Sequence, residues 1–347
     1  MTKLILKLRD RVKKHRVLSS IVVFLAVLCI CMAICVVFLL NDKTINKNNE
    51  YIFIHNNENF EQLSDTFEYR NVIKKNSLSY KFFSHFMKLD KNVKVGHYLI
   101  KSNTPVFKVV RSLRNGEQDP IKVTINSLRT KEDFAKKISQ KLLVSEKEII
   151  DYCDSLNYAY GNQIFFDILA DTYQFYWNAS CKTIFNRLKD VSDRWWNKQE
   201  TTLNQIGLTK QEVIIIASIV QQETTKNDEK PLIAGVYINR LKKGMLLQAD
   251  PTVKFALGNF SLKRIRSEHL KFDSPFNTYI YKGLPPAPIC LPEMSSIKAV
   301  LHYSQHNYLY FCAKEDFSGY HNFATTLQEH NANANKYHRA LNQKNIK

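Results

Sequence analysis

The sequence has no Cys-x-x-Cys pair, no His-Glu-x-x-His motif and no Gly-x-Ser-x-Gly turn. These motifs are the signatures of a zinc-ribbon or thioredoxin-like redox centre, a zinc protease and a nucleophile-elbow hydrolase, so their absence argues against these classes. His302 and His306 are four residues apart at the end of an expected helix, but no third ligand is placed beside them. The chain also has no internal repeat and no low-complexity tract. The sequence therefore predicts neither a metal site nor a bound cofactor.

Cysteine is sparse outside one segment. Three of the seven cysteines lie in a single apolar run, and the others are widely spaced, at Cys153, Cys181, Cys290 and Cys312. In an oxidising compartment these four could form one or two disulfides. Buried free thiols explain the same spacing equally well, so the sequence leaves both alternatives open.

Acidic residues are outnumbered throughout the chain. There are 50 Lys and Arg against 32 Asp and Glu, which gives a formal net charge of +18. Residues 1–16 contain seven basic residues and one acid, a net +6, which leaves +12 for the remainder. Such a surplus indicates an anionic surface or polymer as partner. Nucleic acid is not expected, because the basic residues are scattered and because most of the chain is expected to lie outside the cell.

Residues 21–40 form an uninterrupted apolar run of twenty residues. This length is enough to cross the core of a bilayer as a helix. The basic flank lies before the run, so the positive-inside rule predicts a cytoplasmic tail at 1–16, a transmembrane helix at 17–40 and an exported remainder. The protein is therefore expected in the cytoplasmic membrane, as a single-pass protein whose N-terminus is in the cytoplasm.

Two alternatives to an uncleaved anchor are less consistent with this run. A cleaved signal peptide has a shorter apolar region and small residues before its cut site, whereas this run ends in Val-Val-Phe-Leu-Leu. A lipoprotein signal would need a small residue before its cysteine. Leu28, Ile30 and Ile34 precede the three cysteines of the run, so the anchor is favoured.

The exported part is expected to be α+β, with a short polar linker at 41–50 and a small module at 51–123. Periodicity and turn residues predict strands at 51–55 and 96–100, with helices at 61–73 and 80–89 between them. A further helix at 104–113 and a strand at 121–125 follow. Strand, helix, helix, strand is an order that suits a compact module.

The region 124–347 is expected to be a larger mixed α/β domain. Capping boxes at Ser145–Glu148 and Thr209–Glu212 predict two helix starts. Further helices are expected at 184–196, 232–241, 295–303 and 325–341. Extended segments are expected at 245–249, 279–281 and 308–312, and Asp250 is expected to cap a helix that begins with Pro251.

The helix that follows Thr209 carries the most informative residue, Glu223. Residues 213–220 leave almost no polar face, which is typical of a core helix. Glu223 is three, four and seven residues past Val220, Ile219 and Ile216, so it shares their face. A carboxyl group held against apolar packing has a raised pKa and can act as a general acid near neutral pH. The alternative is that Glu223 has no catalytic role and is a solvated residue at the end of a helix.

Glycoside cleavage normally uses two carboxyl groups, and no second one is evident. We expect Asp228 and Glu229 to be solvated in a charged turn and Asp250 to be a helix cap, and neither Asp273 nor Glu293 stands out. A mechanism with one carboxylate is therefore retained, in which a hydroxyl of the substrate itself attacks. Ser218 lies inside the apolar helix and is expected to serve packing.

Ordered motifs in this chain resemble the endolytic murein transglycosylases, the MltG or YceG-like family. The motifs are ASIVQQET (217–224), GVYINRL (235–241), LQADPTV (247–253), NTY (277–279), GLPPAPI (283–289) and YLYF (308–311). Smaller matches are DTY (171–173), HNF (321–323) and EHN (329–331). The likeness spans the chain from about residue 51 to its end and includes the N-terminal anchor.

The resemblance implies an enzyme of the cytoplasmic membrane that faces the cell wall and cuts inside peptidoglycan strands. The C6 hydroxyl of N-acetylmuramic acid (MurNAc) would attack its own C1, cleaving the bond to N-acetylglucosamine (GlcNAc) and leaving a 1,6-anhydro end. The module at 51–123 would be LysM-like, and peptidoglycan synthases are implied as partners. Such an activity would terminate the elongation of nascent glycan strands.

The family motif places the catalytic glutamate at Glu223. Gln248, Asp250, Asn277 and Tyr279 are expected to line the substrate groove or to brace its walls. Gln221 stands where the family has an acid, which would matter only if that acid shared the proton work. Ala170, Leu291 and Glu293 also depart from the family, which often has proline, asparagine and glycine at these positions.

Two other functions remain compatible with the sequence. A hydrolytic muramidase would need a second carboxylate to position water. A non-catalytic peptidoglycan-binding scaffold would need only the module and is suggested by Gln221.

Overall fold

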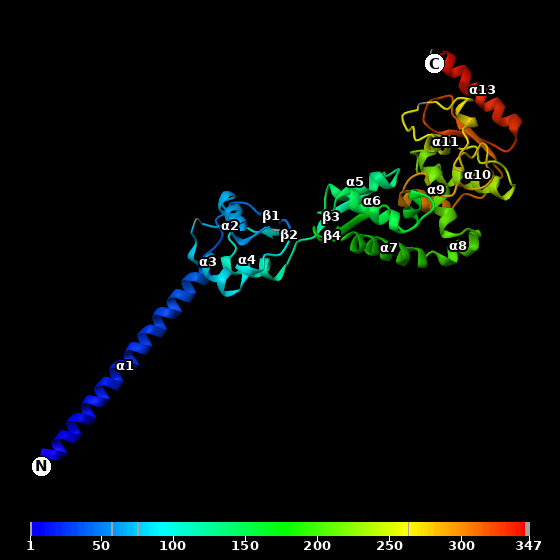
Figure 1. Ribbon diagram of the computed structural model, residues 1–347. Helices are drawn as coiled ribbons and strands as arrows, with labels where there is room; N and C mark the ends of the chain where they lie inside the picture. The colour runs from blue at the N-terminus through cyan, green and yellow to red at the C-terminus, as the bar shows by residue number, and fades with distance from the viewer. Residues whose placement is uncertain (1, 57, 75, 263, 344–347) are drawn as a thin grey trace. The chain divides into compact units, whose positions relative to one another are not determined.

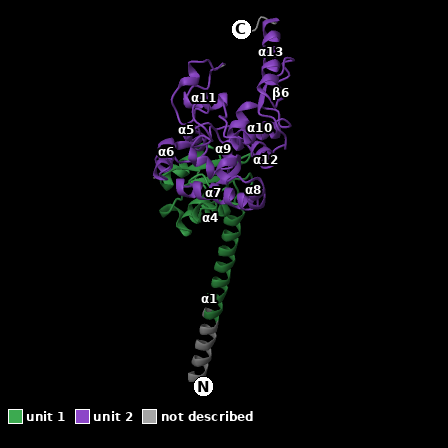
Figure 2. Ribbon diagram, turned by 90° about the vertical axis from the view of Figure 1, so that its right-hand side faces the viewer, with its two compact units in different colours: residues 1–120, 176–178 green, residues 121–175, 179–347 purple. Residues whose placement is uncertain are grey.

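The structure, a computed structural model, describes residues 2–56, 58–74, 76–262 and 264–343. The chain divides into two compact units, shown in green and purple in Figure 2. Unit 1 comprises residues 1–120 and 176–178, and unit 2 comprises residues 121–175 and 179–347. Each unit combines helices with short antiparallel strand pairs, so the expected α+β class is confirmed.

Unit 1 begins with one long helix, α1 (Thr2–Asn41), coloured blue in Figure 1. Its segment Leu18–Asn41 has a mean hydropathy of 3.4 over its most apolar stretch, and that stretch has no buried residue. The helix is therefore long and apolar enough to cross a membrane. Apolar side chains that stay exposed along five turns or more are expected only where lipid or another protein covers them.

The segment 41–50, expected as a linker, packs against the module of unit 1. Thr44 and Asn46 are buried. Thr44 N–H donates to the carbonyl of Thr104 at 2.9 Å, and the Asn46 amide donates to the carbonyl of Ile100 at 3.1 Å. The polar composition that suggested a linker instead supplies side chains that pair with backbone groups of the module.

The module itself has the expected order of strand, helix, helix, strand. β1 (Glu50–Ile54) pairs antiparallel with β2 (Gly96–Ile100), and Ile52 lies opposite Tyr98. The remaining elements are α2 (Phe60–Tyr69), α3 (Leu78–Phe86), η1 (Leu89–Lys91) and α4 (Val106–Asn115). Alternate residues of β1 point into a core that α2, α3 and α4 complete. This period-two burial is the geometry of a β-strand, in which successive side chains point to opposite faces.

Unit 2 has two hydrophobic cores. The first lies around β3 (Ile121–Ile125), which pairs antiparallel with β4 (Asp171–Phe175). Helices α5 (Lys131–Ser139), α6 (Glu146–Ser155) and α7 (Cys181–Asn197), with η2 (Gly161–Phe166), complete it. The sequence did not predict β4. Its two inward aromatic residues, Tyr173 and Phe175, become part of a core only when β4 pairs with β3.

The second core surrounds α9 (Lys210–Glu223), the helix that ends in Glu223. Helices α10 (Lys230–Lys242), α11 (Asp250–Ala256) and α12 (Met294–Leu301) pack against it. The remaining elements are α8 (Glu200–Ile206), η3 (His269–Lys271), the hairpin β5 (Tyr310–Ala313) and β6 (His321–Ala324), and α13 (Leu327–Gln343). α9 is thus enclosed on several sides, as its nearly all-apolar sequence predicts.

The extended segments expected at 245–249 and 279–281 are not strands. Gly244 and Gln248 have φ values of 62° and 52°, and such left-handed backbone interrupts an extended run. Residues 278–280 form a turn. The two segments still meet, because Gln248 N–H donates to the carbonyl of Thr278 at 3.1 Å. The sequence pattern identified the segments that approach each other but not their conformation.

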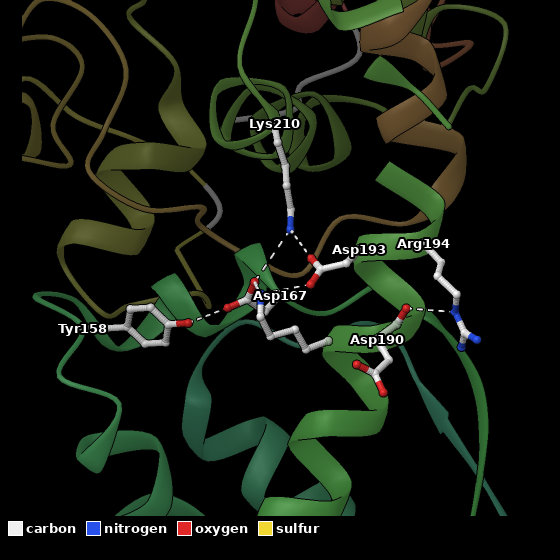
Figure 3. Close-up of polar contacts among 7 residues, drawn as sticks. Tyr158, Asp167, Asp190, Asp193, Arg194 and Lys210 are labelled. Atoms are coloured by element: carbon white, nitrogen blue, oxygen red, sulfur yellow. Dashed lines mark hydrogen bonds and ion pairs between the residues drawn. The ribbon is translucent and has the colours of Figure 1, made fainter. Parts of the chain in front are cut away.

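A network of charged side chains holds the start of α9 (Figure 3). The Lys210 ammonium lies 3.7 Å from Asp167 and 3.4 Å from Asp193 of α7. Lys189 bridges the same two carboxylates at 3.0 and 3.2 Å, and the Tyr158 hydroxyl donates to Asp167 at 2.6 Å. Burial opposes ionisation of Asp167, but Tyr158 and the two lysines outweigh it and lower its pKa.

We expect Asp167→Asn to lower the free energy of unfolding by about 1–2 kcal/mol at pH 7, since it removes a partly buried charge with three partners. Because the pKa of Asp167 is lowered on folding, its charge stabilises the protein above the unfolded-state pKa. That stability is lost as the pH falls through the folded-state pKa. Urea unfolding of the full chain, followed by tryptophan fluorescence between pH 7 and pH 3, measures the difference.

Lys147→Gln is the matched control, because Lys147 and Asp151 form an exposed pair on α6. It should leave the unfolding midpoint unchanged. Equal effects of the two substitutions would show that the network around Lys210 contributes nothing specific.

Candidate active site

Helix α9 begins and ends as its sequence predicts. Thr209 Oγ1 accepts from the Glu212 N–H at 3.2 Å, and Glu212 Oε2 accepts from the Thr209 N–H at 2.8 Å. This reciprocal capping box fixes the first turn. Residues 213–220 are all buried, and the helix stops at Glu223 because Thr224 is extended, with φ −144° and ψ 144°. The side chain of Glu223 therefore leaves the helix at the edge of the core.

The carboxyl group of Glu223 is surrounded by protein although the residue keeps some exposed surface. This burial raises the pKa of Glu223 to about 7. The Tyr237 hydroxyl donates to Glu223 Oε1 at 2.5 Å and opposes the rise. The negative charge of Asp250 adds to the rise, and the attraction of Lys254 opposes it. The expectation of a raised pKa is confirmed, and such a group can both donate and accept a proton at neutral pH.

Tyr237 is the partner that the sequence did not single out. It lies on α10, is buried, and its ring packs edge-on against Phe311 of β5 at 5.9 Å. Burial and the neighbouring Glu223 carboxylate raise the pKa of the Tyr237 hydroxyl well above its usual value. The hydroxyl therefore stays protonated and acts only as a donor to Glu223. The one available signal was a tyrosine in a helix whose other central residues are mostly apolar.

Asp250 and Tyr279 form a second hydrogen-bonded pair beside this site. Tyr279 Oη donates to Asp250 Oδ1 at 2.6 Å, and burial together with this carboxylate raises the pKa of Tyr279. Asp250 is exposed and is the first residue of α11, whose N-cap is Ala249. The expectation that Asp250 caps this helix is therefore wrong, because the chain turns one residue earlier. Its side chain is instead free to bond Tyr279.

Gln248 and Asn277 occupy different environments. Gln248 is exposed, and its side-chain oxygen accepts from Arg240 Nη1 at 3.3 Å. Asn277 is fully buried, and its amide donates to the carbonyls of Leu270 and Phe272 at 3.0 and 2.8 Å. Asn277 thus braces the loop that carries Tyr279, whereas Gln248 is exposed to solvent. The charge of Asp250 acts on Glu223, and the charge of Glu223 acts on Tyr279.

Arg240 of α10 is a second residue that sequence reasoning missed. Its guanidinium is buried and donates to the carbonyls of Leu309 at 2.6 Å and Leu247 at 2.8 Å. It also lies over the Tyr310 ring at 5.1 Å. Arg240 therefore ties α10 to the β5 strand on one side and to the loop before Asp250 on the other. Buried arginine without a carboxylate partner is satisfied here by backbone oxygens.

Gln221 points to α12 and not to Glu223. Its side-chain oxygen accepts from the Glu293 N–H at 2.7 Å and from Ser296 Oγ at 2.9 Å. Gln221 therefore satisfies free donors at the N-terminus of α12, the service that a helix cap performs. A neutral amide is sufficient for it. Glu293 is the residue that immediately precedes α12, and its backbone N–H is one of the donors that Gln221 accepts from.

Glu229 is not solvated, contrary to the sequence-based expectation. It is buried, and its carboxylate accepts from the His321 N–H and contacts His321 Nδ1, both at 2.7 Å. Asp228 remains exposed and accepts from the Tyr320 hydroxyl at 3.1 Å. His321 also packs edge-on against Phe311. The Glu229–His321 pair therefore holds the β6 strand beside the ring that contacts Tyr237.

His302 and His306 do not form a metal site. His306 Nδ1 accepts from the Tyr308 N–H at 3.1 Å, which leaves Nε2–H to donate to the carbonyl of Leu232 at 3.0 Å. Both ring nitrogens are thus bonded to the backbone. Across the part of the chain that the structure describes, no group of three or more His, Cys, Asp or Glu side chains is placed to hold a metal ion.

Ser218 and Cys290 link α9 to the proline-rich loop. Ser218 Oγ donates to the carbonyl of Ile215 at 2.7 Å and accepts from the Ile289 N–H at 3.0 Å. The thiol of Cys290 donates to the carbonyl of Ser218 at 3.5 Å. Ser218 therefore serves packing, as expected. All seven cysteines are free thiols in the structure.

The model of the YceG-like family matches residues 52–336. The chain therefore belongs to the YceG-like family. It is 42% identical to the endolytic murein transglycosylase of Bacillus subtilis (strain 168) over 147 residues. The aligned region covers 42% of this chain and 39% of that protein. It is 23% identical over 314 residues to the endolytic murein transglycosylase of Streptococcus pneumoniae (serotype 2, strain D39), which covers 79% of this chain and 56% of that protein.

Among solved structures, a yceG-like protein of Listeria monocytogenes is similar to this chain with a TM-score of 0.52 and 27% identity. The similarity covers 83% of this chain and 99% of that one. The chain thus spans less than two thirds of the length of the curated relatives, and nearly all of the solved neighbour.

We expect Tyr237→Phe to raise the pKa of Glu223 above its value of about 7, because the hydroxyl that stabilises the carboxylate is lost. The pKa can be followed by NMR of ¹³C-labelled glutamate side chains across pH 5–9. Tyr281→Phe is the matched control, since Tyr281 is an exposed tyrosine bonded to Asp273. A lower or unchanged pKa in Tyr237→Phe would contradict the role given to this bond.

Proposed function

We propose that this chain is a membrane-anchored lytic transglycosylase that cleaves the bond between MurNAc and GlcNAc inside peptidoglycan strands. The observation that carries the proposal is Glu223, whose pKa is about 7 and whose carboxyl is bonded to Tyr237. Two curated relatives are named endolytic murein transglycosylases. A group with this pKa is present in both protonation states near pH 7, which a residue that acts first as acid and then as base requires.

The proposed reaction begins with protonated Glu223. Its proton passes to the glycosidic oxygen as the bond between C1 of MurNAc and that oxygen breaks. The C6 hydroxyl of the same MurNAc then bonds to C1, and its proton returns to the Glu223 carboxylate. The products are a 1,6-anhydro-MurNAc end and a free GlcNAc hydroxyl, and no water is consumed. Glu223 ends in the state in which it began.

Tyr237 supports the second half of this cycle. Its hydroxyl can only donate, so it stabilises Glu223 as a carboxylate and not as an acid. Burial has the opposite effect and favours the acid. The hydrogen bond and burial together keep the free energies of the two protonation states of Glu223 close. This lowers the cost of passing the proton in either direction.

A hydrolytic muramidase is the second candidate, and one observation favours it. Asp250 lies close enough for its charge to raise the pKa of Glu223. A second carboxylate at such a site could orient a water molecule. Against this, Asp250 Oδ1 is already bonded to Tyr279 at 2.6 Å. The lytic reaction is preferred because it needs no second base.

We further propose that α1 anchors the chain in the cytoplasmic membrane with the N-terminus in the cytoplasm, so that unit 2 faces the cell wall. Residues 51–123 would be a LysM-like module that binds peptidoglycan. Their element order β1, α2, α3, β2 and the antiparallel pairing of the two strands support this proposal. In this setting the activity would release nascent strands from peptidoglycan synthases, which are the proposed partners.

We expect Glu223→Gln to lower the cleavage rate by about 10²–10⁴-fold, because the amide can neither give nor take the proton. Wild-type activity should fall as the pH rises through about 7, where the acid form of Glu223 is lost. Mass spectrometry of digested uncrosslinked strands identifies the product, since an anhydro end is lighter than a reducing end by one water.

Glu200→Gln, at the exposed start of α8, is the control and should cleave like wild type. Reducing ends in place of anhydro ends would identify a muramidase. If the wild-type chain binds strands and cleaves none of them, the non-catalytic scaffold is the correct description.

A further inference from the structure

A small pocket of about 80 Å³ lies beside the candidate active site in unit 2. It is lined by Arg129, Gln222, Lys254, Phe255, Phe260 and Ile289, with Pro251 at its edge. We call it the Arg129 pocket. A space of this size admits an acid group together with an adjoining carbon or two.

Neither cation of the Arg129 pocket is paired with an anion of the described residues. The Arg129 guanidinium lies over the Phe260 ring, 4.6 Å from its centre, which fixes its plane. Among the side chains that the structure describes, no carboxylate lies within ion-pair distance of Arg129 or Lys254. Both side chains are only partly exposed. Two half-buried cations around one small cavity form a site for an anion.

The Arg129 pocket is adjacent to Glu223 along two elements. Gln222, which lines the pocket, directly precedes Glu223 on α9. Lys254 is one turn along α11 from Asp250, and its charge acts on Glu223 from beyond ion-pair distance. A substrate whose scissile bond lies at Glu223 would therefore have a neighbouring substituent within reach of this pocket.

We propose that the Arg129 pocket binds a carboxylate carried on the O3 lactyl arm of MurNAc. The inference rests on the proposed function, because it takes peptidoglycan as the substrate. The sugar rings of that polymer are uncharged, so its carboxylates lie on this arm. They have two sources, the free lactyl carboxylate of a strand without peptides, and the carboxylates of an attached stem peptide. The pocket thereby makes the arm, and not the sugars alone, a determinant of cleavage.

The test uses soluble uncrosslinked strands in three forms. One form carries stem peptides, one has been stripped by an amidase and has free lactyl carboxylates, and one has those carboxylates converted to neutral methylamides. Dissociation constants are measured for the full chain with Glu223→Gln, which leaves the strands intact. We expect at least one charged form to bind about tenfold more tightly than the neutral form, as a charge-assisted contact predicts. The preferred form identifies the source of the carboxylate.

Adding Arg129→Gln or Lys254→Gln should reduce this preference to about twofold or less. Lys182→Gln, on the exposed first turn of α7, makes the same change in net charge and should leave the preference intact. Equal binding of all three forms, or a preference that survives both pocket substitutions, would overturn the proposal. Wild-type cleavage that ignores the charge of the arm refutes the subsite alone, whereas no cleavage of any form refutes the proposed function.

A different observation concerns the exposed face of α3 in unit 1. Leu78, Phe82 and Phe86 follow one another at four-residue intervals and so form a single stripe on this helix. Their exposed fractions are 73%, 48% and 72%, and the rings of Phe82 and Phe86 are stacked at 6.0 Å. Three large apolar side chains in a row on a polar protein are the mark of a contact surface.

The stripe begins where the membrane segment ends. Ser77, the N-cap of α3, donates its hydroxyl to Asp42 at 3.0 Å, one residue after α1. Leu39 of α1 packs against the core of the module, and α1 contacts both α3 and α4 (Figure 1). The span Leu18–Asn41 has 24 residues, more than the roughly 20 that cross a bilayer core, so its end can extend to the interface. The start of α3 lies next to this end of the span.

We propose that the stripe of Leu78, Phe82 and Phe86 inserts into the lipid interface of the bilayer that α1 spans. This proposal rests on the proposed anchoring. Exposed Lys81 and Lys88 flank the stripe and could reach lipid headgroups. An apolar face with basic neighbours is typical of a helix that lies in the interface. The module would then be held against the membrane by two elements.

The test is tryptophan fluorescence of the full chain in vesicles that contain lipids brominated near the headgroup. Phe86→Trp should add emission that these lipids quench strongly. Tyr69→Trp, at an aromatic residue of α2 in the same unit that is 88% exposed, should add emission that they do not quench. Equal quenching of the two added signals would overturn the proposal. If the chain does not remain with the vesicles at all, it is the anchoring that fails.

Discussion

The hydrogen bond between Tyr237 and Glu223 is the interaction on which the rest of the site depends. It places a donor that stabilises the Glu223 carboxylate inside surroundings that stabilise the protonated acid. Were Glu223 buried without Tyr237, the acid form would be favoured further and proton return would cost more. Were it solvated, it would be ionised at neutral pH and could not donate. The pKa near 7 requires that burial and the Tyr237 hydrogen bond both act on the Glu223 carboxyl group. Helices α9 and α10 must therefore keep a fixed crossing.

Several independent contacts fix the position of α9. Lys210 anchors its first turn between Asp167 and Asp193, while Gln221 caps α12 from its last turn. Ser218 holds the proline-rich loop at Ile289 from the middle of the helix. Each of these joins α9 to an element distant in sequence. A helix that is apolar on all sides has no face whose exposure sets its rotation, so these polar contacts specify which residues of its last turn face the site.

Much of this site could be predicted from sequence, and the remainder depends on contacts between distant segments. The capping box, the burial of residues 213–220 and the raised pKa of Glu223 follow from residues close together in the chain. The Tyr237 bond depends on how α9 and α10 cross, and Glu229 meets His321 ninety-two residues later. The loop that carries Gln248 turns on left-handed backbone at that residue, which is uncommon for a residue other than glycine. Periodicity contains no signal for such geometry.

The electrostatics of the site also connect Glu223 and the Arg129 pocket in function. Lys254 attracts the Glu223 carboxylate and so holds its pKa down, while Asp250 raises it. A substrate carboxylate bound in the Arg129 pocket would offset the charge of Lys254 and bring a negative charge towards Glu223. Both changes raise the pKa of Glu223 and increase the fraction that is protonated. Substrate binding would thus prepare the acid that begins the reaction, and product release would restore the balance set by Tyr237.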